Sequence, residues 1–182
     1  MKCIYCKTND VKEIIQNNEV YFYCPACQKK SGQAIQSGGR IIQKMHSDGR
    51  EKHVSVGAVI ERDSKFLIAK RRVFEFGYGN IAGHVEYGET PEAAVKREVF
   101  EETGMIVDDM ELFLHEDIDG DRCRRGANIH EYYYFKVHCL GNPVKNKESA
   151  FLNWYKPEEI GKLNLVYVTR YMFEKLGAIQ YV

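Results

Sequence analysis

The feature that most constrains this chain is one helical stretch within residues 83–105, which read GHVEYGETPEAAVKREVFEETGM. Thr90 can cap the start of a helix, Pro91 suits its first position, and Gly104 can end it. The sequence therefore predicts a helix between these signals, and any fold of the chain has to accommodate both this helix and its charged end.

The C-terminal end of this helix is unusually acidic, with three carboxylates within about 100° of arc on one face. Each carboxylate there costs roughly 0.3–1 kcal/mol, and two carboxylates about 5.5 Å apart repel by roughly 3 kcal/mol at an effective dielectric near 20. Magnesium or manganese would offset this repulsion, since both ions prefer oxygen ligands. The alternative is a solvated acidic face, partly neutralised by Arg97. The carboxylates belong to Glu98, Glu101 and Glu102.

The spacing of the whole stretch favours the metal-binding interpretation. Its order is Gly, five residues, Glu, seven residues, Arg-Glu, an apolar residue, one residue, Glu-Glu, one residue, Gly and an apolar residue. This pattern resembles the Nudix box, the signature of the Nudix hydrolases, at every position. Seven fixed identities coincide by chance in about one of a billion windows. The matching residues are Gly83, Glu89, Arg97, Glu98, Val99, Glu101, Glu102, Gly104 and Met105.

The resemblance implies both a fold and an activity. The fold is of the α/β class, a Nudix-type α/β/α sandwich with a mixed sheet. The activity is divalent-metal-dependent hydrolysis of the diphosphate bond in a nucleoside diphosphate linked to another group. Family precedent implies that the three helix-end glutamates hold magnesium or manganese, together with a backbone carbonyl at Gly83 or at Ala82. It also implies that Arg97 orients a box glutamate, here Glu89, and that Glu98 or Glu148 is the general base.

Residues outside the box supply further candidates. Glu148 lies six residues before Trp154, like the metal-site glutamate of MutT-type members, although a plain loop glutamate is the alternative. Arg71 aligns with a basic residue that reaches the substrate in the family, and solvated surface is the alternative. An aromatic loop before the box can stack on a base or pack in the core; its members are Phe74, Phe76 and Tyr78.

The substrate is inferred by elimination. The chain begins with a cysteine-rich module, as NADH pyrophosphatases do, but residues 106–182 contain nothing like their Ser-Gln-Pro-Trp-Pro-Phe-Pro run. Ribbon-bearing members of the family that lack this run include enzymes that split ADP-ribose or FAD, so the resemblance implies ADP-ribose or an FAD-like compound as the first choice. A MutT-type nucleoside triphosphate pyrophosphatase and an NADH pyrophosphatase are the alternatives. A ligand sensor that binds nucleic acid through its N-terminal module is the alternative from another class, and the intact box argues against it.

The N-terminal module has the cysteine spacing of a zinc ribbon. Two C-x2-C pairs are separated by 17 residues, and the segments around Asn17-Asn18 can form two short strands. Four thiolates leave no open position for water, so we expect a structural zinc; two disulfides are the alternative. Nucleic-acid contact by this module is not expected, because its aromatic residues suit a small core. The ligands are Cys3, Cys6, Cys24 and Cys27.

The order of motifs predicts a zinc ribbon over residues 1–33, a linker over 34–52 and a Nudix hydrolase domain over 53–182. Strands are expected at 54–60, 65–69, 81–82, 105–107, 110–115, 129–139 and 151–155, with a charged turn at 116–126 and helices at 157–162 and 166–176. His130 and His138 have no partner at ligand spacing, so we expect structural roles for both. Cys123 and Cys139 resemble ordinary free thiols.

Overall charge is balanced, with 26 basic and 26 acidic residues, so no global field favours nucleic acid or membrane. Residues 1–52 carry a net charge of +4 and the remainder −4. The chain has no stretch of about 20 apolar residues and no secretory signal at its start. We therefore expect a cytoplasmic protein that acts on a small nucleotide. The sequence leaves the oligomeric state open, with a homodimer as one option.

Overall fold

The computed structural model describes residues 1–36 and 39–179. Its central strand is β7 (Glu51–Arg62), in which eight consecutive residues, 53–60, are buried. Such a run is typical of a strand covered on both faces. β7 pairs with β12 (Ile129–Leu140) in parallel, and with β6 (Gln43–Met45), β8 (Lys65–Arg71) and β10 (Ile81–His84) in antiparallel orientation.

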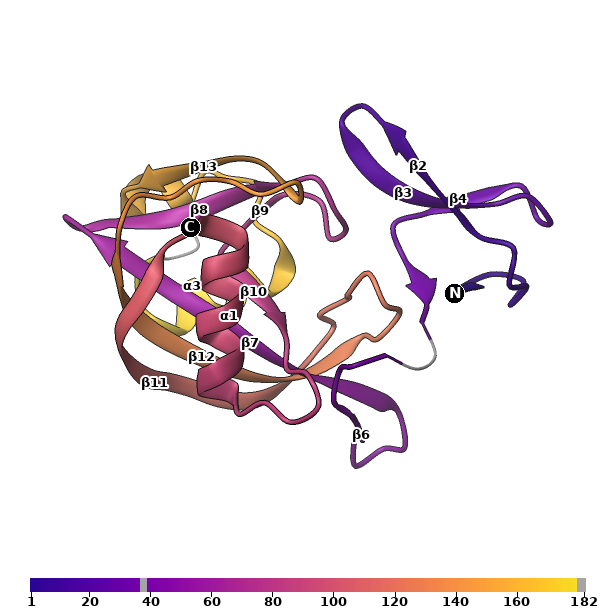
Figure 1. Ribbon diagram of the computed structural model, residues 1–182, viewed down its shortest axis with the longest axis horizontal. Helices are drawn as coiled ribbons and strands as arrows, with labels where there is room; N and C mark the ends of the chain where they lie inside the picture. Colours follow the sequence, from indigo (N-terminus) through magenta and orange to yellow (C-terminus); the bar gives the residue numbers. More distant parts are fainter. Residues whose placement is uncertain (37–38, 180–182) are drawn as a thin grey trace.

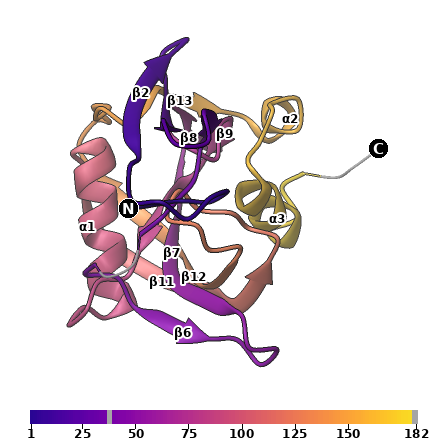
Figure 2. The same cartoon turned by 90° about the vertical axis from the view of Figure 1, so that its right-hand side faces the viewer.

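The remaining strands complete a mixed sheet of eight strands within the described residues. β11 (Ile106–Asp119) pairs with β12 at one edge, β13 (Ser149–Tyr155) pairs with β8 at the other, and β9 (Tyr78–Gly79) also pairs with β8. Helix α1 (Pro91–Thr103) lies on one side of the sheet, and α2 (Pro157–Ile160) and α3 (Tyr167–Lys175) lie on the other (Figure 2). The predicted α/β/α sandwich with a mixed sheet is confirmed.

Helix α1 forms where the sequence predicts it. The Thr90 hydroxyl accepts a hydrogen bond from the Ala93 amide at 3.2 Å, and Pro91 occupies the first turn. Gly104 takes a left-handed φ of 68°, and its amide donates to the Phe100 carbonyl. The helix is therefore closed at both ends by local sequence, which fixes the position of its acidic end relative to the sheet.

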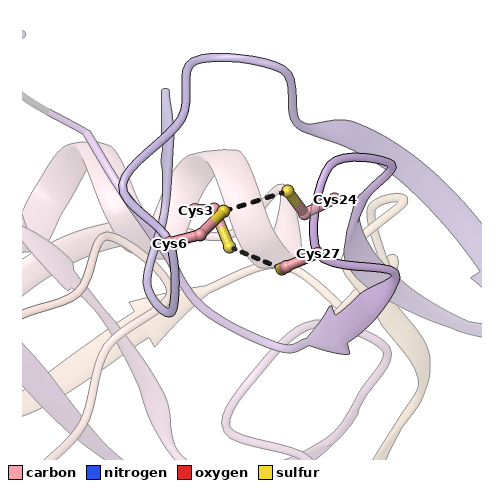
Figure 3. Close-up of side chains that lie close together, drawn as sticks. All are labelled: Cys3, Cys6, Cys24 and Cys27. Carbon is pink, nitrogen blue, oxygen red and sulfur yellow. Dashed lines mark hydrogen bonds between the residues drawn. The ribbon is translucent and has the colours of Figure 1, made fainter.

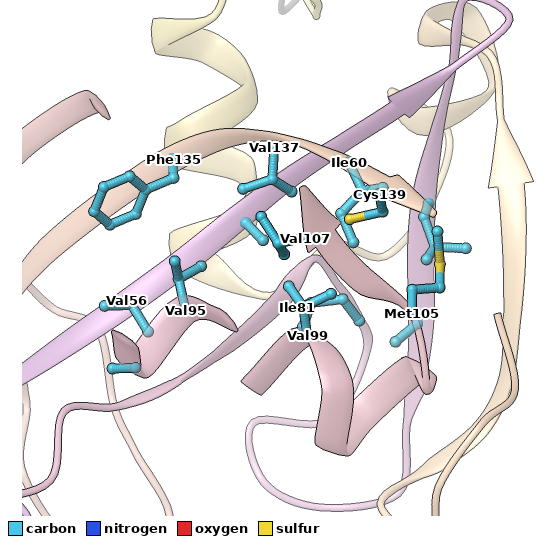
Figure 4. Packing of buried hydrophobic residues seen from close by; sticks show 14 of the residues in the cluster. Val56, Ile60, Ile81, Val95, Val99, Met105, Val107, Phe135, Val137 and Cys139 are labelled. Carbon is cyan, nitrogen blue, oxygen red and sulfur yellow. The ribbon is translucent and has the colours of Figure 1, made fainter. Parts of the chain in front are cut away.

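Two hydrophobic cores lie on the two faces of the sheet. Between the sheet and α1, the side chains of Val95 and Val99 pack against Val56, Ile81 and Phe135 (Figure 4). The opposite core packs α3 against side chains of β8 and β12, including Met172, Phe173, Ile68 and Tyr134. Because side chains alternate along β7, its even-numbered residues face α1 and its odd-numbered residues face the other layer.

The N-terminal module stands beside the sandwich (Figure 1). It contains β1 (Lys2–Cys3), β2 (Lys12–Gln16), β3 (Glu19–Cys24), β4 (Lys29–Ser31) and β5 (Ala34–Ile35), with β2, β3 and β4 in one sheet and β1 paired with β5. Asn17 and Asn18 have φ values of 52° and 62°, as a tight hairpin turn between β2 and β3 requires. None of the helices in the described part of the chain is long and apolar enough to cross a membrane.

The structure corrects two expected boundaries. The two strands expected at 105–107 and 110–115 form one strand, β11, which also extends to Asp119 into the expected turn. Asp108 and Asp109 suggest a break because aspartate is depleted in strands. Register shifts at Val107/Asp109 and Leu112/Leu114 let the strand continue with both aspartates exposed.

Gly57 is the position in β7 where any side chain is excluded. A Cβ there would lie 2.0 Å from the Tyr134 ring. We expect Gly57→Ala to lower the free energy of unfolding by about 1–3 kcal/mol, because the ring has to move within a packed core. Gly161→Ala is the matched control, since a Cβ there meets nothing within 4 Å. Urea denaturation of both variants measures the effect, and equal stabilities would contradict it.

Candidate active site

The acidic end of α1 faces β10, and the space between them exists because residue 83 of β10 is a glycine. The Glu98 side chain is 15% exposed, whereas that of Glu101 is 56% exposed. A Cβ on Gly83 would lie 2.0 Å from Glu98 Cδ and 2.1 Å from Oε1. The glycine therefore makes the space that the Glu98 carboxylate occupies, beside the backbone of β10.

Arg97 holds three carboxylates of the box in place. Its Nε and Nη2 donate to both oxygens of Glu89 at 2.7 and 2.9 Å, and its Nη1 donates to Glu98 at 2.7 Å and to Glu101 at 3.3 Å. Nη2 also donates to the His84 carbonyl at 2.9 Å. A guanidinium bound in this forked manner orients carboxylates strongly. Its hydrogen bonds to Glu89 hold the pKa of that carboxyl below its usual value.

The surroundings of Glu102 disfavour the ionised form of its carboxyl group. Burial raises its pKa to about 8; the charge of Arg71 opposes this shift, and the charges of Glu98 and Glu148 add to it. Burial also raises the pKa of Glu98, against the opposing effect of Arg97 and with further contributions from Glu101 and Glu148. Four negative groups thus lie close enough to disfavour one another's ionisation.

These groups line a cleft of about 720 Å³. Besides the carboxylates, Arg71, Phe74, Ala82 and Gly83 contribute to its walls. A loop between β11 and β12 adds three guanidinium groups that the sequence analysis described only as part of a charged turn. The run of three arginines in four residues was the signal for them; they are Arg122, Arg124 and Arg125. The cleft therefore combines an acidic wall with groups that bind phosphate.

Two of the three aromatic residues proposed to stack on substrate lie outside this cleft. Phe74 is among its lining residues. Phe76 packs on Tyr21 of the N-terminal module, with ring centroids 4.7 Å apart, and Tyr78 packs on Phe151 and Tyr155. The placement argues against substrate stacking by Phe76 and Tyr78, because their rings are engaged in packing between elements.

The donor set at the acidic wall fits magnesium or manganese. Its side-chain donors are carboxylate oxygens, with the backbone of Ala82 and Gly83 beside them, and these are the hard ligands that both ions prefer. The raised pKa of Glu102 points the same way, because a cation among these carboxylates would favour their charged forms.

The four cysteines of the N-terminal module converge as their spacing predicts (Figure 3). Cys3 Sγ lies 3.7 Å from Cys27 Sγ, and Cys6 Sγ lies 3.5 Å from Cys24 Sγ. Around a tetrahedral zinc with bonds of about 2.3 Å, neighbouring sulfurs are separated by about 3.8 Å. The thiols are free rather than joined in disulfides, so the arrangement is compatible with a zinc ribbon.

A second group of four donors was not expected from the sequence. His53, His84, Cys123 and His130 place one ligand atom each within 4.8 Å of one another. The expectation that His130 has no partner at ligand spacing is therefore wrong, because strand pairing joins residues far apart in the chain. Cys123 is a free thiol, as expected, but it lies within this cluster. His138 and Cys139 lie outside this cluster; His138 instead contacts exposed Asp108 at 2.7 Å.

Comparison with known proteins agrees with the fold and the site. The family model for the NUDIX domain matches residues 51–176. The fold and the carboxylate site are those of the Nudix class. This chain belongs to the Nudix family.

The relatives it resembles carry several activities in their names. It is 47% identical over 55 residues to an ADP-ribose pyrophosphatase of Methanocaldococcus jannaschii, covering 29% of this chain and 32% of that one. It is 43% identical over 98 residues to a NAD-capped RNA hydrolase NudC of Haemophilus influenzae, covering 50% and 36%. The chain thus spans about a third of the length of each. A MutT NUDIX hydrolase structure from Burkholderia pseudomallei superposes with a TM-score of 0.59, at 28% identity, over 68% of this chain and 96% of that one.

The gap at Gly83 yields a direct test of the site. We expect Gly83→Ala to displace the Glu98 carboxylate and lower turnover about 100-fold while the fold persists, because the flexible end of Glu98 can move aside. Initial rates with a diphosphate substrate and thermal unfolding of the same samples provide the measurement. Full activity in a folded variant would show that Glu98 does not need this position.

Proposed function

We propose that this Nudix hydrolase cleaves the diphosphate bond of a nucleoside diphosphate linked to another group, with ADP-ribose or an FAD-like compound as its substrate. The observation that carries this proposal is the convergence of Glu98, Glu102 and Glu148 from two separate segments into one cleft with Arg71. Repulsion among these carboxylates disfavours the fold unless it serves a bound cation. A diphosphate is a ligand that brings such a cation with it.

Glu98, Glu101 and Glu102, with the backbone of Gly83, are the groups that would hold magnesium or manganese. When bound, the ion supplies positive charge to the diphosphate oxygens and activates water as a nucleophile. Arg97 keeps Glu98 and Glu89 in fixed orientations through the hydrogen bonds described above. Arg71 offers positive charge to the phosphate chain, and Phe74 offers an aromatic face at the cleft.

The proton of the attacking water needs an acceptor, and two carboxylates of the cleft suit the task. Arg97 holds Glu98 in place, and burial raises the pKa of Glu98. The raised pKa lies closer to neutral pH, where a general base is most effective. Glu148 lies on a different segment, and its charge acts on both Glu98 and Glu102. Comparing Glu98→Gln with Glu148→Gln separates them: the variant that lacks the general base loses the acidic limb of the pH–rate profile, where the wild-type rate falls as that carboxylate becomes protonated.

The choice of substrate rests on the relatives and on the cleft. The two relatives named above are an ADP-ribose pyrophosphatase and a NAD-capped RNA hydrolase, and both names describe adenosine diphosphate groups linked to a second moiety. The chain lacks the Ser-Gln-Pro-Trp-Pro-Phe-Pro run of NADH pyrophosphatases, and this absence favours ADP-ribose over an NAD-type substrate. A MutT-type nucleoside triphosphate pyrophosphatase is the second candidate, supported by Glu148 and by the Burkholderia pseudomallei structure.

A substrate panel tests the proposal. ADP-ribose, FAD, NADH, a sugar nucleotide and a nucleoside triphosphate are each incubated with the full chain and magnesium or manganese, and the products are separated by ion-exchange chromatography. We expect cleavage between the two phosphates of ADP-ribose or FAD. Preferential release of pyrophosphate from the triphosphate would favour the MutT-type candidate, and no turnover of any diphosphate would contradict the proposal.

Glu102→Gln tests the role of the acidic wall. We expect at least a ~100-fold loss of turnover without unfolding, because one ligand of the cation is removed. Magnesium should also raise the melting temperature of the wild type more than that of the variant. Glu92→Gln, an exposed substitution in the first turn of the same helix, is the matched control and should retain activity. Unchanged turnover in Glu102→Gln would exclude this residue as a ligand.

The raised pKa of Glu102 predicts a pH-dependent stability. Without a divalent ion, the folded chain keeps the Glu102 proton up to a pKa of about 8, whereas the unfolded chain releases it near the ordinary glutamate pKa of 4.5. The stability contributed by the protonated form is therefore complete below pH 4.5 and is lost as pH rises towards 8. In buffer free of magnesium and manganese, the melting temperature of Glu102→Gln minus that of the wild type should therefore increase from pH 5 to pH 8. A pH-independent difference would contradict the shift.

A further inference from the structure

We propose that His53, His84, Cys123 and His130 form a second zinc site, distinct from the four-cysteine site and from the acidic wall of the cleft. Three imidazoles and one thiolate are the nitrogen and sulfur donors that tetrahedral zinc prefers, whereas the acidic wall offers only oxygen. Each of the four residues offers a ligand atom within 4.8 Å of the others.

The strands bring the three imidazoles together by register rather than by sequence spacing. His130 of β12 is the direct partner of His53 on β7, and His84 of β10 is the partner of Ser55, two residues further along β7. The three side chains therefore emerge from neighbouring strands on the same face of the sheet. Their ring centroids are 5.2, 5.6 and 5.6 Å apart.

The distances between donor atoms match a tetrahedral ion. His53 Nδ1 lies 3.4 Å from His84 Nε2 and 3.6 Å from Cys123 Sγ. Zinc bonds of about 2.0–2.1 Å to nitrogen and about 2.3 Å to sulfur place tetrahedral neighbours about 3.4 Å apart for two nitrogens and about 3.6 Å for nitrogen and sulfur. The four-cysteine site of the same structure agrees equally well with its own expected spacing.

The surroundings of the cluster also suit a metal. Ligand histidines in proteins usually hold their second ring nitrogen against a carboxylate. His53 Nε2 lies 3.0 Å from Glu51 Oε1, and His130 Nδ1 lies 2.9 Å from Asp121 Oδ2. Both imidazoles are 1% exposed, and His130 Nε2 has no hydrogen-bond partner among the described residues. A buried ring nitrogen without a partner costs free energy, which coordination removes.

The position of the site indicates a structural role. Four protein ligands leave no open position for water. Cys123 lies in the loop between β11 and β12, and this loop supports the N-terminal module: the Gln33 side chain donates to the Cys123 carbonyl, and the Ala34 amide donates to the Arg124 carbonyl. A metal there would fasten the loop, and with it the N-terminal module, to three strands of the sheet in the wall of the cleft, since His84, Cys123 and His130 also line that cleft.

Zinc content is the first test. The full chain is incubated with zinc chloride, desalted and analysed by inductively coupled plasma mass spectrometry. We expect two zinc ions per wild-type chain, one in Cys123→Ser, one in Cys24→Ser, and two in the control Cys139→Ala, which removes a thiol outside both sites. One zinc in the wild type, unchanged by Cys123→Ser, would overturn the proposal; a metal-free thiolate–imidazolium pair is the arrangement that this result would support.

Spectroscopy and diffraction remove the ambiguity of a variant that folds poorly. In cobalt-substituted samples, thiolate-to-metal absorption of Cys123→Ser should be lower than that of the wild type by about one fifth, since five thiolates become four. Anomalous diffraction at the zinc edge should show a peak among His53, His84, Cys123 and His130. Zinc density confined to the four cysteines would refute the second site.

The carboxylate partners allow a finer test. Glu51→Gln should weaken zinc binding at this site about 10- to 100-fold, because Glu51 orients His53. Glu61→Gln, an exposed change further along the same strand, is the matched control and should leave affinity unchanged. Competition with a chromophoric zinc chelator measures both. Equal affinities would show that His53 is not a ligand.

Discussion

The burial of β7 on both faces is the constraint on which the rest of the structure depends. Its even-numbered side chains, such as Val54 and Val56, form the core beneath α1 and so set the height of the acidic helix end above the sheet. Its odd-numbered side chains, such as His53 and Ser55, face the other layer, and Gly57 leaves room there for the Tyr134 ring. One strand thus positions the carboxylates by one face and the histidine cluster by the other.

Arg97 fixes the carboxylates of the site relative to this scaffold. Its five hydrogen bonds reach three glutamates and the backbone of β10, so the helix and the strand are joined at the point where charge is most concentrated. The bond to the His84 carbonyl has a second effect. It holds the backbone of His84, which belongs both to the box and to the proposed zinc cluster. The acidic wall and the histidine cluster are therefore joined through one segment of β10.

Local signals in the sequence predicted what local chemistry determines. The cap at Thr90, the stop at Gly104, the Asn17-Asn18 turn and the two C-x2-C pairs each depend on neighbours in the chain, and each forms as expected. The box also predicted three carboxylates at one helix end, and Glu98, Glu101 and Glu102 line one cleft. The aromatic residues were harder, because whether Phe76 faces a cleft or Tyr21 depends on where another module docks.

The histidine cluster lay beyond such reasoning for a physical reason. His53 and His130 are far apart in sequence and meet only because β7 and β12 pair in parallel with one particular register. A shift of one residue would turn one of them to the other face. Spacing rules for metal ligands describe knuckles and helices, and they miss donors that separate strands bring together.

The contacts between residues 33–36 and the arginine loop mean that the two modules share an edge. Backbone amides of Ala34 and Gln36 satisfy the carbonyls of Arg124 and Arg125, while Arg124 pairs with Glu13 and lies over the Phe22 ring at 4.7 Å. Removing residues 1–36 would take these partners away from the arginine loop that lines the cleft and would leave the Arg124 and Arg125 carbonyls unpaired. A Nudix domain prepared without these residues would therefore differ from the full chain at the cleft itself, because the arginine loop that lines the cleft would lack its partners.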